Sequence, residues 1–224
     1  MQKTAKPGFT KGNAYLFDPN IWCWNVPSGF TCPGAKACLA WADKDTGKIT
    51  LGKHNEFKCY SAVTERFPAV RAKSWANRDL VFGLDPVLVA NAITELMPAN
   101  AKLIRIHAAG DFFSQEYFDG WLEACRRKPH VKFWAFTKSL PFWIARIDQI
   151  PPNLNLTASI GGKHDGLVAE HRLRYARVVY SPAEAEALAL EIDSGDRLAA
   201  FGLMPFALLE NFGSKRKASL PMAV

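Results

Sequence analysis

Three cysteines lie in a loop-rich stretch near the start of the chain. Cys32 and Cys38 enclose the segment Pro-Gly-Ala-Lys-Ala, and Cys59 follows after twenty intervening residues. The proline and glycine after Cys32 favour a turn, which lets a loop fold around a metal. Thiolates are soft ligands that select zinc or iron–sulfur clusters over magnesium or calcium. The trio predicts a metal centre, either zinc with a fourth ligand or an iron–sulfur cluster with one open iron.

Two other residues are candidates for a fourth ligand, His54 and Cys23. Cys23 stands between two tryptophans on an expected strand, and Cys125 lies on the apolar side of an expected helix, so both are also typical of buried thiols. The five cysteines are unevenly spread and do not form an even-numbered disulfide framework. The alternative for the trio itself is that its thiols only pack in the interior.

A second polar group ends the apolar run Lys102–Ala108, which predicts a strand. Because α/β folds build their sites at the carboxyl ends of strands, His107 and Asp111 are expected at such a site. Gly110 would let a ligand approach the backbone. Asp111 can orient a substrate amine or ribose hydroxyl, or serve as a general base. The alternative is that Asp111 helps to cap the next helix and that His107 is a hydrogen-bonded core histidine.

Two further strand ends carry polar residues. Lys138 offers an amine at the start of an expected helix, where an anionic group can bind, and Ser159 and Gly161 follow another strand. The catalytic candidates are Asp111, His107 and Lys138. The cofactor-binding candidates are Gly110, Asp111, Ser159 and Gly161. The metal candidates are Cys32, Cys38 and Cys59.

The elements that position these residues alternate between strands and helices. Because parallel neighbours need a crossover, the alternation predicts an α/β fold with a parallel sheet. Ser114 is placed to cap one helix, and Ser181 begins a capping box with Glu184. The expected strands are Ile21–Val26, Lys102–Ala108, Val131–Thr137, Leu154–Ile160, Ala176–Tyr180 and Arg197–Gly202. The expected helices follow Ser114, Ser139 and Ser181, and the last continues to about Ile192.

The length of 224 residues favours one α/β domain over residues 1–224. It divides into a loop-rich cysteine segment (1–62), a βα scaffold (63–210) and a basic tail (211–224). No apolar run is long enough to span a membrane, and the polar start lacks the core of a signal peptide. We therefore expect a cytoplasmic protein without a membrane partner.

The net charge of +7 favours an anionic partner such as a nucleotide or nucleic acid. Between Glu65 and Arg78, basic residues alternate with Trp75, as nucleic-acid contacts often do. The alternative is a solvated basic helix with Trp75 packed inward. The run Lys215–Lys217 is either a solvated tail or a phosphate contact.

Four segments of the chain resemble a phage family known as gene product eighty-eight, which implies no particular activity. The segments are Cys32–Ala35, Cys59–Ala62, His107–Ser114 and Phe136–Ser139, and the resemblance extends from about Phe30 to Leu209.

The order of parts also resembles that of radical S-adenosylmethionine enzymes. In both, an early three-cysteine loop follows a first strand, and a later strand ends in a glycine followed by an acid. The resemblance implies a parallel-stranded partial (β/α)6 barrel and a [4Fe-4S] cluster on Cys32, Cys38 and Cys59. It also implies that Gly110 and Asp111 contact the amino group of S-adenosylmethionine. The cysteine spacing is wider here, and the acid is Asp where those enzymes have Glu.

Three functions are compatible with these patterns. The leading one is an iron–sulfur, radical-type enzyme that modifies a nucleotide or nucleic-acid base. The second replaces the cluster with Zn²⁺ in a base-exchanging or hydrolytic enzyme, with Asp111 as the acid–base or nucleophilic group. The third is a non-enzymatic module in which zinc staples the loop and the basic surface binds nucleic acid.

Overall fold

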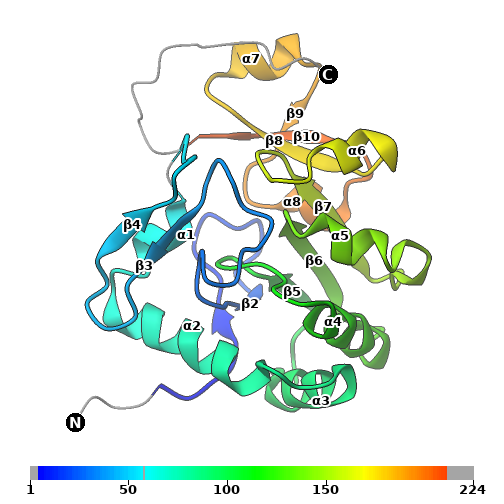
Figure 1. The fold of residues 1–224 in the computed structure, drawn as a ribbon. Helices are drawn as coiled ribbons and strands as arrows, with labels where there is room; N and C mark the ends of the chain where they lie inside the picture. Colours follow the sequence, from blue (N-terminus) through cyan, green and yellow to red (C-terminus); the bar gives the residue numbers. More distant parts are fainter. Residues whose placement is uncertain (1–4, 58, 211–224) are drawn as a thin grey trace.

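The computed structural model describes residues 5–57 and 59–210 (Figure 1). In this part of the chain the main sheet has eight strands in the order β1-β2-β5-β6-β7-β8-β10-β9. All neighbouring strands are parallel except β1 and β2, so the predicted mixed α/β fold with a mostly parallel sheet is confirmed. The strands are β1 (Thr10–Lys11), β2 (Trp22–Trp24), β5 (Leu103–Ile106), β6 (Lys132–Thr137), β7 (Leu154–Ser159), β8 (Tyr175–Val179), β9 (Glu191–Ile192) and β10 (Phe206–Leu209).

Helices cover both faces of this sheet. On one face α3, α4 and α5 pack over a core that includes Trp24, Ile104 and Phe133. On the other face α8 contacts β6 and β7. The helices are α1 (Tyr60–Thr64), α2 (Pro68–Val81), α3 (Pro86–Leu96), α4 (Gln115–Arg127), α5 (Leu140–Ile144), α6 (Gly166–Glu170), α7 (Pro182–Ala187) and α8 (Arg197–Phe201), with a short 3₁₀ helix, η1 (Ile147–Gln149).

The sequence of strand β6 is an almost unbroken apolar run because both faces of the strand are covered. Phe133 and Ala135 pack toward the helices α3 and α4, whereas Trp134 packs into the core on the α8 side. A strand that is buried on both faces has no solvent side on which polar residues could alternate. The strand was therefore predictable by its apolar length and not by alternation.

Helix α4 forms as its sequence predicts. Ser114 caps it by accepting a hydrogen bond from the backbone N–H of Tyr117 at 3.2 Å. Its buried residues recur at helical spacing and include Cys125, which is confirmed as a core thiol.

The strand predicted at Arg197–Gly202 is wrong, because Arg197–Phe201 forms the helix α8. The Asp193 carboxylate accepts hydrogen bonds from the backbone N–H groups of Leu198 at 3.1 Å and Ala199 at 2.9 Å. These bonds satisfy donors that the first turn of a helix leaves free. The strand that completes the parallel series is β10, a few residues later.

The capping box at Ser181 is confirmed, but the end predicted for its helix is wrong. Ser181 Oγ accepts a hydrogen bond from the N–H of Glu184 at 3.2 Å. The helix ends at Ala187 and not near Ile192, since Ala189 adopts a left-handed φ of 53°. The chain then enters the short edge strand β9.

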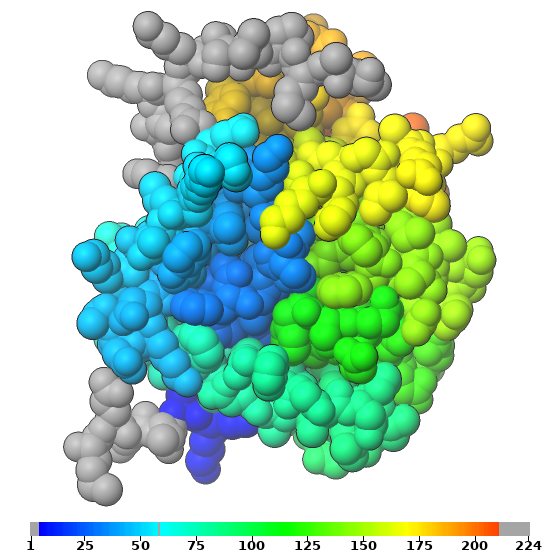
Figure 2. Space-filling view, viewed as in Figure 1, coloured from blue at the N-terminus to red at the C-terminus, as the bar shows by residue number. Residues whose placement is uncertain are grey.

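The cysteine segment adds a separate antiparallel hairpin, β3 (Ala40–Ala42) and β4 (Ile49–Leu51), followed by α1. In Figure 2 its blue and cyan residues fill the middle and left of the face, beside the green and yellow loops that follow β5 to β7. None of the described helices combines the length and hydrophobicity that a membrane crossing requires. The run Lys215–Lys217 lies outside the described residues.

Candidate functional site

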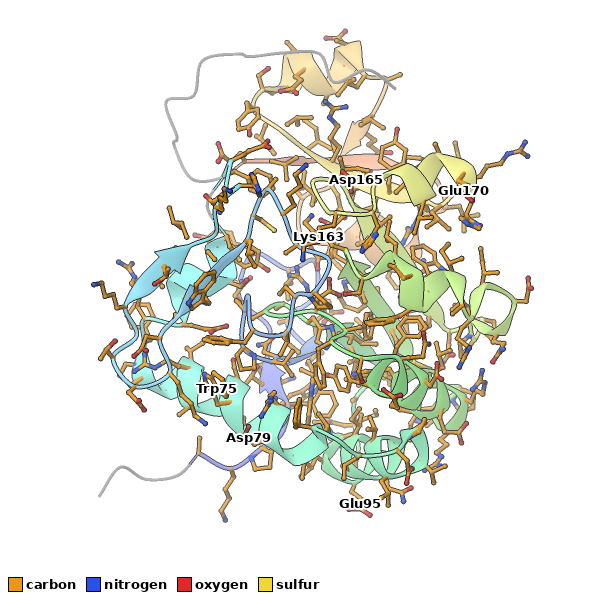
Figure 3. The ribbon with its side chains drawn as sticks, viewed as in Figure 1. Trp75, Asp79, Glu95, Lys163, Asp165 and Glu170 are labelled. Carbon is orange, nitrogen blue, oxygen red and sulfur yellow. The ribbon has the colours of Figure 1, made fainter. Side chains whose placement is uncertain are left out.

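The loop between Cys32 and Cys38 lies directly on the strand ends. A Cβ on Gly34 would collide with the backbone carbonyl of Lys138, at the end of β6. The N–H of Ala37 donates to the carbonyl of Gly161 at 2.9 Å, beyond the end of β7. Lys163, labelled in Figure 3, fixes the loop from the same side by donating its amine to the carbonyl of Pro33 at 2.7 Å. The thiols are thereby held at the carboxyl edge of the sheet.

Gly110 permits a close approach to its backbone, but the group that approaches is the protein's own loop and not a ligand. It has a φ of 82°, and a Cβ there would collide with Val26 and lie 2.6 Å from Thr31 Oγ1. Only glycine tolerates both the left-handed φ and the contact at no cost. Gly110 therefore joins the end of β5 to the segment that leads into Cys32.

Asp111 is buried and accepts three hydrogen bonds. Its Oδ1 accepts from the hydroxyl of Thr137 at 2.6 Å and from the N–H of Phe112 at 2.8 Å, and its Oδ2 accepts from the N–H of Lys138 at 2.8 Å. Burial raises the pKa of Asp111 to about 6, although the three hydrogen bonds oppose the shift. The carboxyl group ties β5 to β6 and is mostly ionised at neutral pH.

The Lys138 side chain crosses to the next strand end. Its Nζ donates to Ser159 Oγ at 2.6 Å and to the carbonyls of Ser159 and Ile160, each at 2.9 Å. An ammonium group has three donors, so all of them are used. Lys138 supplies a positive charge at this edge without a free N–H.

We use the name thiol face for the five groups that share this edge: Cys32, Cys38, Cys59, Asp111 and Lys138. The three thiols are partly buried and free of disulfides. Burial raises the pKa of Cys32 and of Cys38. The nearby negative charges of Asp111 and Cys59 raise both pKa values further. The positive charge of Lys138 opposes the rise in the pKa of Cys38. These interactions couple the five groups electrostatically.

The donor atoms are of the kind that zinc and iron–sulfur clusters take, because all three thiols are free and Lys138 lies near Cys38. Among residues 5–57 and 59–210, no three His, Cys, Asp or Glu side chains converge on a single ion position. Of the two candidate fourth ligands, Cys23 is buried in the core between the sheet and α8, and His54 is exposed. Both lie outside the thiol face.

His107 packs into the main hydrophobic core, although it is only four residues from Asp111. Its Nε2 shares a hydrogen bond with the Tyr117 hydroxyl at 2.9 Å, and its ring packs edge-on against Phe112 and Trp121. We call these four residues the His107 core. Burial lowers the pKa of His107 to about 3. The histidine is neutral and has the surroundings of a core residue, so the contacts favour the structural alternative.

A hydrogen-bonded chain behind Cys59 was not predicted from the sequence. Cys59 Sγ lies 3.2 Å from Ser61 Oγ, which lies 3.1 Å from Ser28 Oγ. Ser28 in turn bonds Glu65 Oε1 through both its N–H and its hydroxyl, each at 2.8 Å. Glu65 is fully buried, and burial raises its pKa to about 7. We call these residues the Glu65 chain; its only sequence signal is an acid in a basic stretch.

A second network that the sequence did not reveal starts at Tyr60, beside Cys59. The Tyr60 hydroxyl donates to the carbonyl of Ala108 at 2.7 Å and accepts from Arg105 at 3.2 Å. Arg105 Nε pairs with Asp196 at 3.0 Å. These contacts fasten the start of α1 to β5 and so fix the position of Cys59.

The fold and the site together define a mixed α/β protein whose thiols, carboxyl group and amine gather at the carboxyl ends of parallel strands. The chain belongs to the family described as Gene product 88, whose model matches residues 2–219. The predicted resemblance to this phage family is therefore confirmed.

Two curated relatives are phage proteins. The chain is 26% identical over 219 residues to the Gene 88 protein of Mycobacterium phage L5, covering 86% of this chain and 85% of that protein. It is 30% identical over 137 residues to the Gene 88 protein of Mycobacterium phage D29, covering 57% of this chain and 50% of that protein. No solved structure matches the chain.

Proposed function

We propose that the protein is an iron–sulfur enzyme of the radical S-adenosylmethionine type that modifies a nucleotide or a nucleic-acid base in the cytoplasm. One observation carries the proposal. The cysteine loop after β2 lies on the ends of β6 and β7, so that three free thiols share one electrostatic environment with Asp111 and Lys138.

The strand order supports the same proposal. Six of the parallel strands lie side by side in the order β2-β5-β6-β7-β8-β10, which is also their order along the chain, whereas β9 lies outside β10 and departs from this order. A closing or partly closing barrel grows in this way, whereas a doubly wound sheet reverses direction at a switch point. We propose that this sheet corresponds to a partial (β/α)6 barrel with the cysteine segment as its metal-binding part.

Cys32, Cys38 and Cys59 would hold a [4Fe-4S] cluster, which supplies one-electron chemistry when it is bound. The raised thiol pKa values of Cys32 and Cys38 mean that both are protonated at neutral pH, so metal binding must release their protons. The ammonium group of Lys138 lowers the cost of placing thiolate charge beside it.

Asp111 would act by position. Its three hydrogen bonds hold the carboxylate rigidly between β5 and β6, and an ionised carboxylate attracts a ligand ammonium group such as the amino group of S-adenosylmethionine. Lys138 fixes Ser159 in turn, so that the ends of β6 and β7 form one wall together with Gly161. The net charge of +7 supports an anionic substrate.

The test is reductive cleavage of S-adenosylmethionine. Protein reconstituted with iron and sulfide without oxygen is incubated with S-adenosylmethionine and dithionite, and methionine and 5′-deoxyadenosine are measured. We expect both products from the native protein, and more than a tenfold loss in Asp111→Asn. Asp119→Asn, a partly exposed acid on α4, is the matched control and should retain activity.

Two results would contradict the proposal: iron-loaded native protein that releases neither product, or an Asp111→Asn variant with native activity. A protein that instead takes up zinc and no iron would favour the zinc-containing enzyme or the zinc-stapled binding module.

A further inference from the structure

Five aromatic rings, in two groups joined by the guanidinium of Arg78, form a row at the surface. We call it the aromatic strip. Its rings lie in sequence from the hairpin to the loop after β5: Trp41, Phe30, Trp75, Phe82 and Phe113. The Phe30 ring centroid lies 6.4 Å from that of Trp41 and 5.1 Å from that of Trp75. At the other end, the rings of Phe82 and Phe113 are 6.1 Å apart.

Two cations complete the aromatic strip. The Arg78 guanidinium bridges its middle, 5.9 Å from the Trp75 ring and 3.5 Å from the Phe82 ring. The Lys44 amine lies 4.3 Å from the Trp75 ring. Cations over aromatic faces combine a flat stacking surface with positive charge, and this pairing is characteristic of single-stranded nucleic-acid grooves.

The strip is accessible where a base would have to stack. Phe30 is 52% exposed and Phe82 is 55% exposed. Half-exposed rings interleaved with cations are the arrangement on which single-stranded nucleic acids stack, so the row supports a binding role. Trp75, projecting from α2 in Figure 3, is only partly buried, so the predicted inward packing is incomplete.

Other charges on α2 do not compete for the same role. Asp79 pairs with Arg78 at 3.0 Å and with Lys44 at 3.5 Å, and all three are at the surface. Exposed pairs of this kind are weak, so a phosphate can replace the carboxylate. Arg71 is buried and donates to backbone carbonyls, and Lys73 donates to the carbonyl of Lys6. Arg78 and Lys44 are therefore the cations of the strip.

Two rings of the aromatic strip lie on the loops that carry residues of the thiol face. Phe30 precedes Cys32 by two residues, and Phe113 follows Asp111 by two residues. A polymer bound to the strip would therefore contact the same two loops that carry Cys32 and Asp111.

We propose that the aromatic strip binds single-stranded nucleic acid, with bases stacked on Phe30 and Phe82 and the phosphate backbone beside Arg78 and Lys44. The inference rests on the proposed function for its substrate class and adds the polymeric form and the binding surface. Paired bases cannot offer their faces to the rings, so a duplex should bind more weakly.

The test is fluorescence anisotropy of a labelled oligodeoxythymidylate of about twenty nucleotides, long enough for several stacked bases. The full chain is used as purified, without iron or S-adenosylmethionine. We expect binding that weakens as salt increases, because phosphate contacts release counterions. Phe30→Ala with Phe82→Ala should weaken binding at least tenfold, and Arg78→Ala should also weaken it while reducing the salt dependence.

The matched control is Tyr15→Ala with Phe201→Ala, which removes two exposed rings that lie outside the strip. It should bind as the native protein does, and circular dichroism should show that all variants are folded. The inference is overturned if the native protein does not bind, if the Phe30 and Phe82 double variant binds normally, or if a duplex binds equally well.

The readout separates this inference from the proposed function. Reconstituted protein that cleaves S-adenosylmethionine but does not bind the oligonucleotide overturns the inference alone. Protein that binds through the strip but cleaves nothing leaves the surface in place and contradicts the radical enzyme.

Discussion

The thiol face is a polar cluster and the His107 core is a largely aromatic one, yet their strand-end residues, Asp111 and His107, lie only four positions apart. Asp111 accepts three hydrogen bonds and connects two strands, and it shares its electrostatic environment with thiols. The His107 side chain shares a hydrogen bond with Tyr117 and is otherwise surrounded by aromatic rings. A residue that is close in sequence to a predicted site is therefore not always part of that site. Whether it belongs there depends on the groups that the residue contacts.

The two regions also respond to pH in opposite directions. Burial favours the neutral form of every titratable group, which is the protonated form of a carboxyl group but the deprotonated form of a histidine. Asp111 and Glu65, in and behind the thiol face, are therefore easier to bury at low pH, and His107 is easier to bury at high pH.

The largest effect is expected from Gly34→Ala, which pushes the cysteine loop away from Lys138. The added Cβ meets backbone that cannot rotate away, so we expect a loss of more than about 3 kcal/mol in unfolding free energy. Iron loading should also fall sharply. Gly166→Ala is the control, since nothing lies within 4 Å of its added Cβ. Urea unfolding measures the loss of stability, and iron analysis measures the loss of iron. Equal stability and equal iron content in the two variants would contradict the distinct role assigned to the thiol face.

Glu65 should make the protein less stable as pH rises. With a folded pKa of about 7 against an ordinary value of 4.5, Glu65 keeps a proton that the unfolded chain has lost. Stability from this group is therefore full below pH 4.5 and is lost as pH rises through 7, by about 3 kcal/mol in total. Glu65→Gln should make the unfolding free energy less dependent on pH between pH 6 and 7.5. This range lies above the one in which Asp111 affects stability. An unchanged slope in that variant would show that Glu65 is already ionised in the folded protein.

His107 should act in the reverse direction. Its folded pKa of about 3 lies below its ordinary value of 6.5, so the unfolded chain takes up a proton first. The stabilising effect is complete above pH 6.5 and is lost as pH falls, by about 2.5 kcal/mol at pH 4.5. His107→Phe should remove this acid sensitivity in urea titrations at several pH values. If S-adenosylmethionine cleavage by this variant also disappears while the fold persists, His107 belongs to the site after all.

The smallest effect is expected from Ser61→Ala, which interrupts the Glu65 chain at its centre. It removes the contacts of Ser61 with Cys59 and Ser28, each near 3 Å, and should cost about 1 kcal/mol. The pH slope assigned to Glu65 should persist, because Ser28 still bonds the carboxyl group. Thermal unfolding of Ser61→Ala is compared with that of Ser181→Ala, which removes a helix cap far away in the sequence. The comparison tests whether the Glu65 chain contributes specifically to stability.

Most of the sheet was predictable because buried parallel strands appear as short apolar runs between capped helices. The run of β6 and the Ser114 cap of α4 are local signals of this kind. The error at Arg197–Phe201 arose because the four apolar residues after Arg197 fit a buried strand or a helix equally well. The Asp193 carboxylate that decides in favour of the helix was not recognised as a cap.

The candidate site was predictable in its members more than in its arrangement. Polar residues after strands identified Asp111 and Lys138, because carboxyl ends of parallel strands meet at one edge. The contact of Gly34 with Lys138 joins segments far apart in the sequence, and no local pattern encodes it. For the same reason the Glu65 chain was missed, since its partner Ser28 lies 37 residues away.

The central claim is that Cys32, Cys38 and Cys59 form one cluster site at the strand ends. Its most direct test is the iron content and visible spectrum of protein reconstituted without oxygen, beside the Cys32→Ala, Cys38→Ala, Cys59→Ala triple variant, with Cys125→Ala as the core control. We predict a brown protein with about four irons per chain, unchanged in the control and absent from the triple variant. A colourless native protein, or a triple variant that keeps its iron, would contradict the claim.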